Sequence, residues 1–244
     1  MEQGKLQRTF LTTPDQCGMT GRLSPLAPFT IFQALASEHA EQIGVGFAAM
    51  AKRREFWLTV HCRVEFDAEA GLLEELTGET WPEACEPGPL RCYRSYRLCR
   101  GETVVARGRT QWAILGPEGR VVPFGASGFP EHFPFPEGPA IDRAPQRFRD
   151  DFTEADAVFS YQVRSTDIDL GRHMNNVAYV RVLLGCLSAA ELASGVAAME
   201  VHYAAPCLEG EVLTVCCKRE EKLIRLAMKK ADGHHAVLGA IELR

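Results

Sequence analysis

The strongest constraint on the fold is an order of secondary-structure signals that occurs twice along the chain. In each half, a short strand is followed by an apolar helix and then by alternating strands. A helix that is mostly apolar must be covered over most of its surface, and a curved antiparallel sheet can provide that cover. The sequence therefore predicts an α+β protein of two similar units, each a long helix wrapped by a curved antiparallel sheet.

The first unit is predicted to begin with a short strand near Arg8–Thr12 and a helix over Pro25–Ile43. Ser24 is the expected N-cap of this helix, because proline at the first helical position is compatible with a cap just before it. Residues 58–66 and 104–114 alternate in polarity with a period of two, which indicates half-buried antiparallel strands.

The second unit shows the same order. Residues 159–164 alternate as a strand, and a helix is predicted over Asn176–Ala193. Further strands are expected at 198–205, 211–218, 222–230 and 235–243. Sliding the sequence along itself by 150 residues places Pro25–Gln33 against Asn175–Leu183, and sliding it by 132 residues places Gly101 against Gly233.

A proline- and glycine-rich stretch separates the two periodic regions. Residues 121–150 contain no clear helical or strand period, because these residue types interrupt regular elements. We therefore expect an N-terminal domain at 1–125, a linker at 126–150 and a C-terminal domain at 151–244.

Composition excludes several classes of protein. The 244 residues carry a net charge of −5, which does not favour nucleic-acid binding, and no apolar run is long enough to cross a membrane. The N-terminus lacks the apolar stretch of a signal peptide. Nine cysteines without a C-x-x-C pair argue against a disulfide framework and a structural zinc site. We expect a cytoplasmic protein with reduced thiols, no metal and no cofactor.

Basic side chains are concentrated in two places. Residues 218–230 read KREEKLIRLAMKK, and Arg164, Arg172 and Arg181 lie near the candidate site described next. Mixed charge of this kind is typical of a solvated strand face, and it is also suited to docking an acidic partner. The sequence leaves both interpretations open.

The stretch most suited to chemistry lies between a predicted strand and the second helix. Residues 165–179 read STDIDLGRHMNNVAY and bring two acids, a histidine and two asparagines into one turn. Asn175 or Asn176 can cap the helix, and the N–H groups at a helix start can stabilise a developing oxyanion. Thioester hydrolysis needs such donors and a base for water, whereas a thiolate leaves with little acid assistance.

This stretch resembles the D-x-D-x-N-x-H-x-N-N-x-x-Y signature of plant and bacterial acyl-ACP thioesterases. Short words at 57–58, 78–81 and 108–112 are also similar to words of that family, so the resemblance covers nearly the whole chain. It implies a double hotdog fold, two fused hotdog domains, and hydrolysis of fatty acyl-ACP to free fatty acid and acyl carrier protein in the second unit.

Two positions depart from the family pattern. Gly171 stands where the family has a catalytic Asn, and Pro206-Cys207 stands where it has Glu-Cys. The resemblance therefore leaves Asp169, His173 and Asn175 as the expected catalytic residues. The supporting residues that we expect are Asn176, Gly171 and Cys207. Asp169 also matches the aspartate of simpler hotdog acyl-CoA thioesterases, whereas Cys207 is not expected to be a nucleophile because its sequence neighbours offer no thiolate stabilisation.

The first unit is expected to be catalytically silent. At an offset of 150 residues it has Met19 opposite Asp169 and Leu23 opposite His173. Its helix is expected to line an acyl-chain tunnel instead, with bulky side chains at Phe29, Ile31 and Phe32.

Other functions remain compatible with these residues. The nearest is an acyl-CoA thioesterase, and a further alternative is a non-catalytic acyl-thioester binding protein. A hotdog hydratase or dehydratase resembles a different pattern, with Asp and His five residues apart, whereas Asp169 and His173 are four apart. The carrier, the acyl-chain length and a homodimeric assembly stay open.

Overall fold

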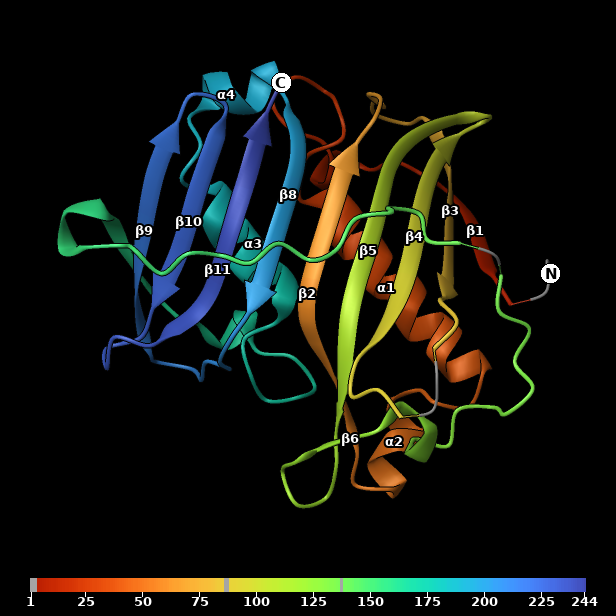
Figure 1. Cartoon of the computed structure of the whole chain (residues 1–244). Helices are drawn as coiled ribbons and strands as arrows, with labels where there is room; N and C mark the ends of the chain where they lie inside the picture. Colours follow the sequence, from red (N-terminus) through yellow and green to blue (C-terminus); the bar gives the residue numbers. More distant parts are fainter. Residues whose placement is uncertain (1–3, 86–87, 137) are drawn as a thin grey trace. The chain divides into compact units, whose positions relative to one another are not determined.

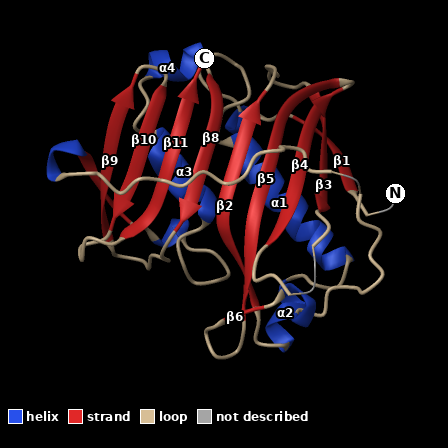
Figure 2. Cartoon of the chain, in the orientation of Figure 1, coloured by secondary structure: helices blue, strands red, loops and turns tan. Residues whose placement is uncertain are grey.

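The computed structural model describes residues 4–85, 88–136 and 138–244. The chain divides into two compact units, Met1–Ala144 and Pro145–Arg244, and the dividing point falls inside the stretch expected to be a linker. Each unit consists of an antiparallel sheet with a helix across one face (Figures 1 and 2). The chain is thus an α+β protein of two fused hotdog domains, as predicted.

The sheet of the first unit has the strand order β1-β3-β4-β5-β2, and a short strand, β6, pairs with β5. Its strands are β1 (Leu6–Leu11), β2 (Phe56–Phe66), β3 (Glu75–Pro82), β4 (Cys92–Arg100), β5 (Thr103–Leu115) and β6 (Val121–Val122). The long helix is α1 (Ala27–Gln42), and a short helix, α2 (Phe47–Lys52), follows it.

Helix α1 lies against the sheet because two glycines leave room for its side chains. A Cβ built at Gly108 on β5 would lie 2.6 Å from the ring of Phe32, and one at Gly78 on β3 would lie 2.8 Å from Leu35. The start of the helix differs from the prediction, because the N-cap is Leu26 and not Ser24. The backbone carbonyl of Ser24 still accepts the N–H of Ala27, at 3.0 Å.

The sheet of the second unit has the strand order β7-β9-β10-β11-β8. Its elements are β7 (Ala157–Gln162), α3 (Asn176–Leu184), α4 (Ala189–Ser194), β8 (Val196–Tyr203), β9 (Val212–Glu220), β10 (Leu223–Lys229) and β11 (His235–Leu243). In both units the first strand forms one edge, the helix follows it, and the second strand forms the other edge. The predicted internal repeat is therefore a repeat of topology.

The second helix is shorter than predicted. The sequence predicts one helix to Ala193, but α3 ends at Leu184 with Gly185 as its C-cap. Ser188 then starts α4, and its side chain accepts the N–H of Glu191. A strong capping residue inside an apolar helical period starts a new helix there, which the period alone does not reveal.

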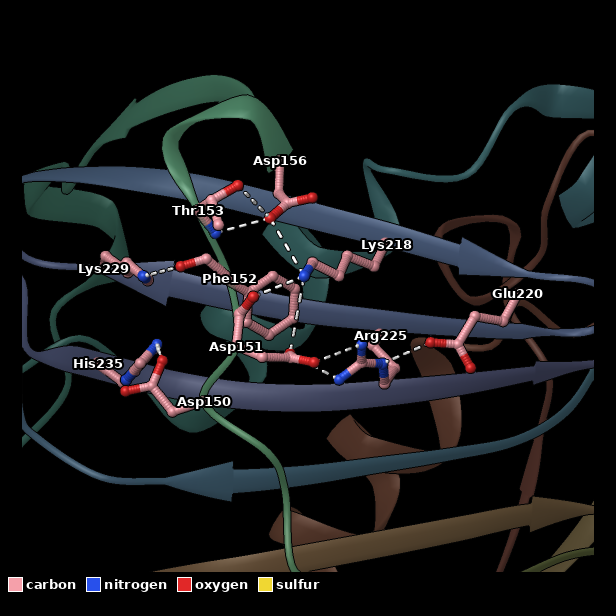
Figure 3. A network of polar contacts seen from close by, with 10 residues as sticks. All are labelled: Asp150, Asp151, Phe152, Thr153, Asp156, Lys218, Glu220, Arg225, Lys229 and His235. Atoms are coloured by element: carbon pink, nitrogen blue, oxygen red, sulfur yellow. Dashed lines mark hydrogen bonds and ion pairs between the residues drawn. The ribbon is translucent and has the colours of Figure 1, made fainter.

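A segment without regular structure, residues 145–153 (the strap), crosses one face of the second unit's sheet (Figure 3), and α3 lies on the other face (Figure 1). Phe152 of this strap is buried and packs against Cys216, Ala227 and Leu238. Earlier in the chain, Phe129 packs against the apolar core of the first unit. Both phenylalanines anchor chain that forms no regular element. No helix in the described ranges is long and apolar enough to span a membrane.

Candidate active site

The turn between β7 and α3 is closed by its own backbone. The N–H of Asp169 donates to the carbonyl of His173 at 3.0 Å, and the N–H of Arg172 donates back to the carbonyl of Asp169 at 2.9 Å. Arg172 adopts a left-handed conformation with φ of 61°. The N–H of Met174 donates to the carbonyl of Cys207 at 2.8 Å, which ties the turn to the segment after β8. The turn therefore has a defined shape before any side chain is considered.

Both carboxylate oxygens of Asp169 have donors. Oδ1 accepts the backbone N–H of Gly171 at 2.8 Å, and Oδ2 accepts the side-chain amide of Asn175 at 3.3 Å. The other side-chain atom of Asn175, Oδ1, accepts the N–H of Val177 at 2.8 Å and so caps α3. Asn175 thus fixes the helix start and the carboxylate together, while Asp169 itself remains exposed.

Asp169 and His173 flank the same point in space. A Cβ built at Gly171 would lie 3.1 Å from Oδ1 of Asp169 and 4.0 Å from Nδ1 of His173. Gly171 therefore lies close to both a carboxylate and an imidazole, and the side chains of Asp169 and His173 are exposed. An exposed carboxylate and an exposed imidazole close to one residue can hold and deprotonate a water molecule.

The two remaining residues of the expected site have mainly backbone roles. Asn176 is the first residue of α3, and its carbonyl accepts the hydroxyl of Tyr203 at 3.2 Å. Cys207 is fully buried, and burial raises the pKa of its thiol. Tyr179 and Lys230 act in the opposite direction on this pKa, but burial is the largest cause. The structure thus brings together Asp169, His173, Asn175 and Gly171, and gives Cys207 an environment that disfavours the thiolate.

Asp167, the other acid of the turn, is held inside it and is not exposed as Asp169 is. It is only 4% exposed, and its Oδ2 accepts the Tyr161 hydroxyl at 2.7 Å and the Arg164 N–H at 2.9 Å. The guanidinium of Arg181 lies 3.9 Å from its other oxygen. The available signal was the three-residue spacing from Arg164, which is typical of an acid that caps a short turn. Asp167 is a structural residue beneath the site.

The first unit contains an equivalent turn without the carboxylate. The N–H of Gly18 donates to the carbonyl of Arg22 at 2.8 Å, as that of Asp169 does to His173. The bridge between Cys17 and Leu23 likewise matches the one between Ile168 and Met174. The counterparts of Asp169 and His173 are therefore Gly18 and Arg22, one residue from the expected Met19 and Leu23.

The three residues expected to line a tunnel belong to α1, and their side chains are buried. Phe29, Ile31 and Phe32 of α1 are 5%, 7% and 3% exposed. The ring of Phe32 stacks on that of Tyr96 with centroids 4.8 Å apart. These residues form the apolar interior of the first unit.

The basic stretch 218–230 largely contacts the chain itself (Figure 3). The guanidinium of Arg225 donates to both carboxylate oxygens of Asp151 at 2.8 and 3.1 Å, which lowers the pKa of that carboxyl. Lys218 and Lys229 donate to the carbonyls of Asp151 and Phe152. Three cations of this stretch thus bind the strap. This favours a structural role for the stretch over docking of an acidic partner.

A known family matches the second unit. Residues 151–241 match the family model described as the acyl-ACP thioesterase C-terminal domain. A comparison with curated protein sequences gives no match.

Solved structures resemble the whole chain in fold. A crystal structure of an acyl-ACP thioesterase from Bacteroides thetaiotaomicron has a TM-score of 0.88 at 18% identity, covering 99% of this chain and 98% of that one. A 12:0-ACP thioesterase from Umbellularia californica has a TM-score of 0.85 at 16% identity, covering 100% and 98%. An oleoyl thioesterase (putative) from Lactobacillus plantarum has a TM-score of 0.82 at 17% identity, covering 100% and 97%. Residues 151–241 thus match the C-terminal domain of acyl-ACP thioesterases, and the whole chain has the double hotdog fold of these solved structures.

Proposed function

We propose that the chain hydrolyses the thioester of a fatty acyl-ACP, releasing free fatty acid and acyl carrier protein, at Asp169 and His173 of the second unit. The observation that carries the proposal is that the Asp169 carboxylate and the His173 imidazole both lie close to Gly171, on one exposed turn. Asp169 is the exposed acid of this turn, and the side-chain amide of Asn175 fixes its carboxylate.

The chemistry assigns one role to each group. Asp169 accepts a proton from water as the water oxygen attacks the thioester carbonyl carbon. His173 orients that water or donates a hydrogen bond to the carbonyl oxygen. The positive end of the α3 dipole stabilises the oxyanion, and the C–S bond then breaks. The leaving thiolate takes up a proton afterwards, because a thiol pKa of about 8.5 makes it a good leaving group.

Acyl carrier protein is the proposed carrier because of the family match over the catalytic unit. The exposed side chains of Arg164, Arg172 and Arg181 surround the turn and provide positive charge for an anionic carrier. Coenzyme A is also anionic, so charge alone does not separate the two carriers. Turnover of one acyl group carried on ACP and on coenzyme A, measured with the same preparation, separates them. A higher kcat/KM on coenzyme A would replace the proposed carrier by the alternative one.

The role of Asp169 is tested by Asp169→Asn, which keeps the size of the side chain and removes the base. We expect kcat on acyl-ACP to fall roughly 10²- to 10⁴-fold while the circular dichroism spectrum and Tm stay unchanged. Cys207→Ala is the matched control and should retain activity, because Cys207 is buried and its thiol pKa is raised. Near-normal turnover in a folded Asp169→Asn protein, or a trapped acyl group on Cys207, would contradict the mechanism.

The first unit is proposed to set the acyl-chain length. Its equivalent turn has Gly18 in place of a catalytic carboxylate, and its helix buries Phe29, Ile31 and Phe32 instead. A unit without catalytic groups can use its apolar interior to hold an aliphatic chain. The non-catalytic alternative, an acyl-thioester binding protein, predicts no hydrolysis by the wild-type chain on either carrier.

A further inference from the structure

The first unit buries a positive charge on the face of its sheet that α1 covers. Arg94 lies on β4 with its side chain on the same face as that of Tyr96, because alternate residues of a strand share a face. Tyr96 stacks on Phe32 of α1, so this face is the one covered by the helix. Arg94 is only 8% exposed, and burial lowers the pKa of its guanidinium.

The groups that contact this guanidinium are neutral. Within the described ranges, Nη1 of Arg94 lies 3.0 Å from Nδ1 of His39 and 3.3 Å from Oγ1 of Thr80. Burial and the neighbouring Arg94 lower the pKa of His39 to about 4, so its ring is uncharged near neutral pH. The hydroxyl of Thr80 donates to the carbonyl of Ser95 at 3.0 Å and therefore presents a lone pair to Arg94. Neither contact cancels the positive charge.

Two other arginines of the same sheet are paired with carboxylates. Arg109 on β5 donates to both carboxylate oxygens of Glu83, and Arg107 donates to both oxygens of Asp67. Both of those arginines are more exposed than Arg94. A buried cation is costly unless it is paired. Arg94 is more buried than Arg107 and Arg109 and contacts only neutral groups among the described residues, which favours an anionic ligand as its partner.

The surroundings specify what else that ligand carries. The stacked aromatic rings of Tyr96 and Phe32 lie on the same face of the sheet as Arg94. The ring of Phe133 lies 6.2 Å from that of His39 and belongs to a segment, 129–136, that forms no helix or strand. An anion at one end of an apolar interior is the arrangement suited to an amphiphile.

We propose that Arg94, with His39 and Thr80 beside it, binds a carboxylate attached to an aliphatic chain. A planar guanidinium is the side chain best matched to a carboxylate. Two sources have this chemistry: a free fatty acid, and an acyl chain that carries a second carboxylate at its far end. The proposal goes beyond the hydrolysis described above, and binding to Arg94 does not require that hydrolysis occurs.

The test for a free fatty acid is equilibrium binding of dodecanoate and of dodecanol, measured by calorimetry. All proteins carry Asp169→Asn, so the result does not depend on catalysis. With Arg94 present, dodecanoate should bind about tenfold or more tightly than dodecanol, because a charge-assisted hydrogen bond is lost with the alcohol. Arg94→Met should abolish this preference, and Arg94→Lys should keep part of it. A merely structural arginine would weaken both ligands alike.

The test for a carboxylate-bearing acyl chain uses the enzyme with Asp169 intact. Dodecanoyl and ω-carboxydodecanoyl thioesters on the same carrier are compared for kcat/KM. If the acyl chain supplies the carboxylate, Arg94→Met should lower kcat/KM about tenfold for the ω-carboxy substrate only. The proposal is overturned if Arg94→Met is folded and neither the dodecanoate preference nor the ω-carboxy preference changes, or if the wild-type side chain gives neither preference.

Discussion

The backbone N–H of Gly171 donates to Oδ1 of Asp169, and a Cβ added at Gly171 would lie 3.1 Å from that same oxygen. The carboxylate therefore lies beside Gly171 in the direction that a side chain at this position would take. The acyl-ACP thioesterase signature that this stretch resembles has an Asn at this position, where Gly171 instead allows close contact between backbone and carboxylate.

Gly171→Ala should lower activity without lowering stability. The added methyl group pushes the Asp169 carboxylate by a few tenths of an ångström, and we expect roughly a tenfold lower kcat, because small displacements of a catalytic base reduce rates steeply. Gly171 is exposed and does not have a positive φ, so the change should leave Tm unaltered or raise it slightly. Kinetics and thermal unfolding of the same preparation check this. Unchanged kcat would mean that the base is not held by this contact.

His173→Ala should reduce kcat by roughly 10- to 100-fold, less than Asp169→Asn, because His173 assists and does not replace the base. The side chain of His173 is exposed, so the fold should be unaffected. His173→Gln is the informative companion, since it keeps a hydrogen-bond donor without an ionisable ring. If both variants have wild-type kcat and KM, His173 has no part in the mechanism.

Phe32→Leu should change the preferred acyl-chain length if the first unit holds the chain. Phe32 fills the space over Gly108 and stacks on Tyr96, so replacing it with Ala would cost about 3–5 kcal/mol of stability and confuse the result. Leucine removes less volume, and each additional methylene that can be buried contributes about 0.8 kcal/mol. We expect a shift towards longer chains in competition assays. Phe29→Leu and Ile31→Val test the neighbouring wall positions, and an unchanged profile in all three would contradict the tunnel.

His39 should make the first unit less stable in acid. Its pKa is about 4 in the folded chain against 6.5 as the ordinary value, so the unfolded chain binds more protons between these pH values. The stabilisation from the neutral ring is complete above about pH 6.5 and is lost as the pH falls towards 4, by up to about 1.4 kcal/mol per pH unit. Chemical unfolding at a series of pH values checks this against His39→Gln, which should remove that part of the slope. Parallel slopes for the two proteins would show that His39 is not the group responsible.

Much of the fold followed from hydrophobic periods. The strands of the second unit and the start of α3 at Asn176 lie close to the predicted bounds, because period-two and helical patterns there are not interrupted. The glycines at 101 and 233, aligned by the repeat, both adopt positive φ in strand-connecting turns. The site was found as a cluster because its residues are adjacent in the chain.

What the sequence could not give depends on contacts between distant residues. Strand β4 was not assigned, because arginines at 91, 94, 97 and 100 recur every three residues and hide the period of two. For the same reason nothing marked Arg94 as buried. The sequence placed the counterpart of Asp169 one residue away, at Met19, because the two turns are aligned by backbone contacts, the Gly18 hydrogen bond and the Cys17–Leu23 bridge, which the sequence does not show.

The strap also determines where an isolated second domain would have to begin. A fragment that started at β7 would lack Phe152, exposing the apolar side chains around Ala227, and would leave Arg225 without the carboxylate of Asp151. Such a fragment should be prone to aggregation, and it should bind anions through the cations that the strap no longer contacts. A fragment that starts at Pro145 would retain both contacts. A fragment that is to fold as the second domain should therefore include the strap, although the strap has no secondary structure of its own.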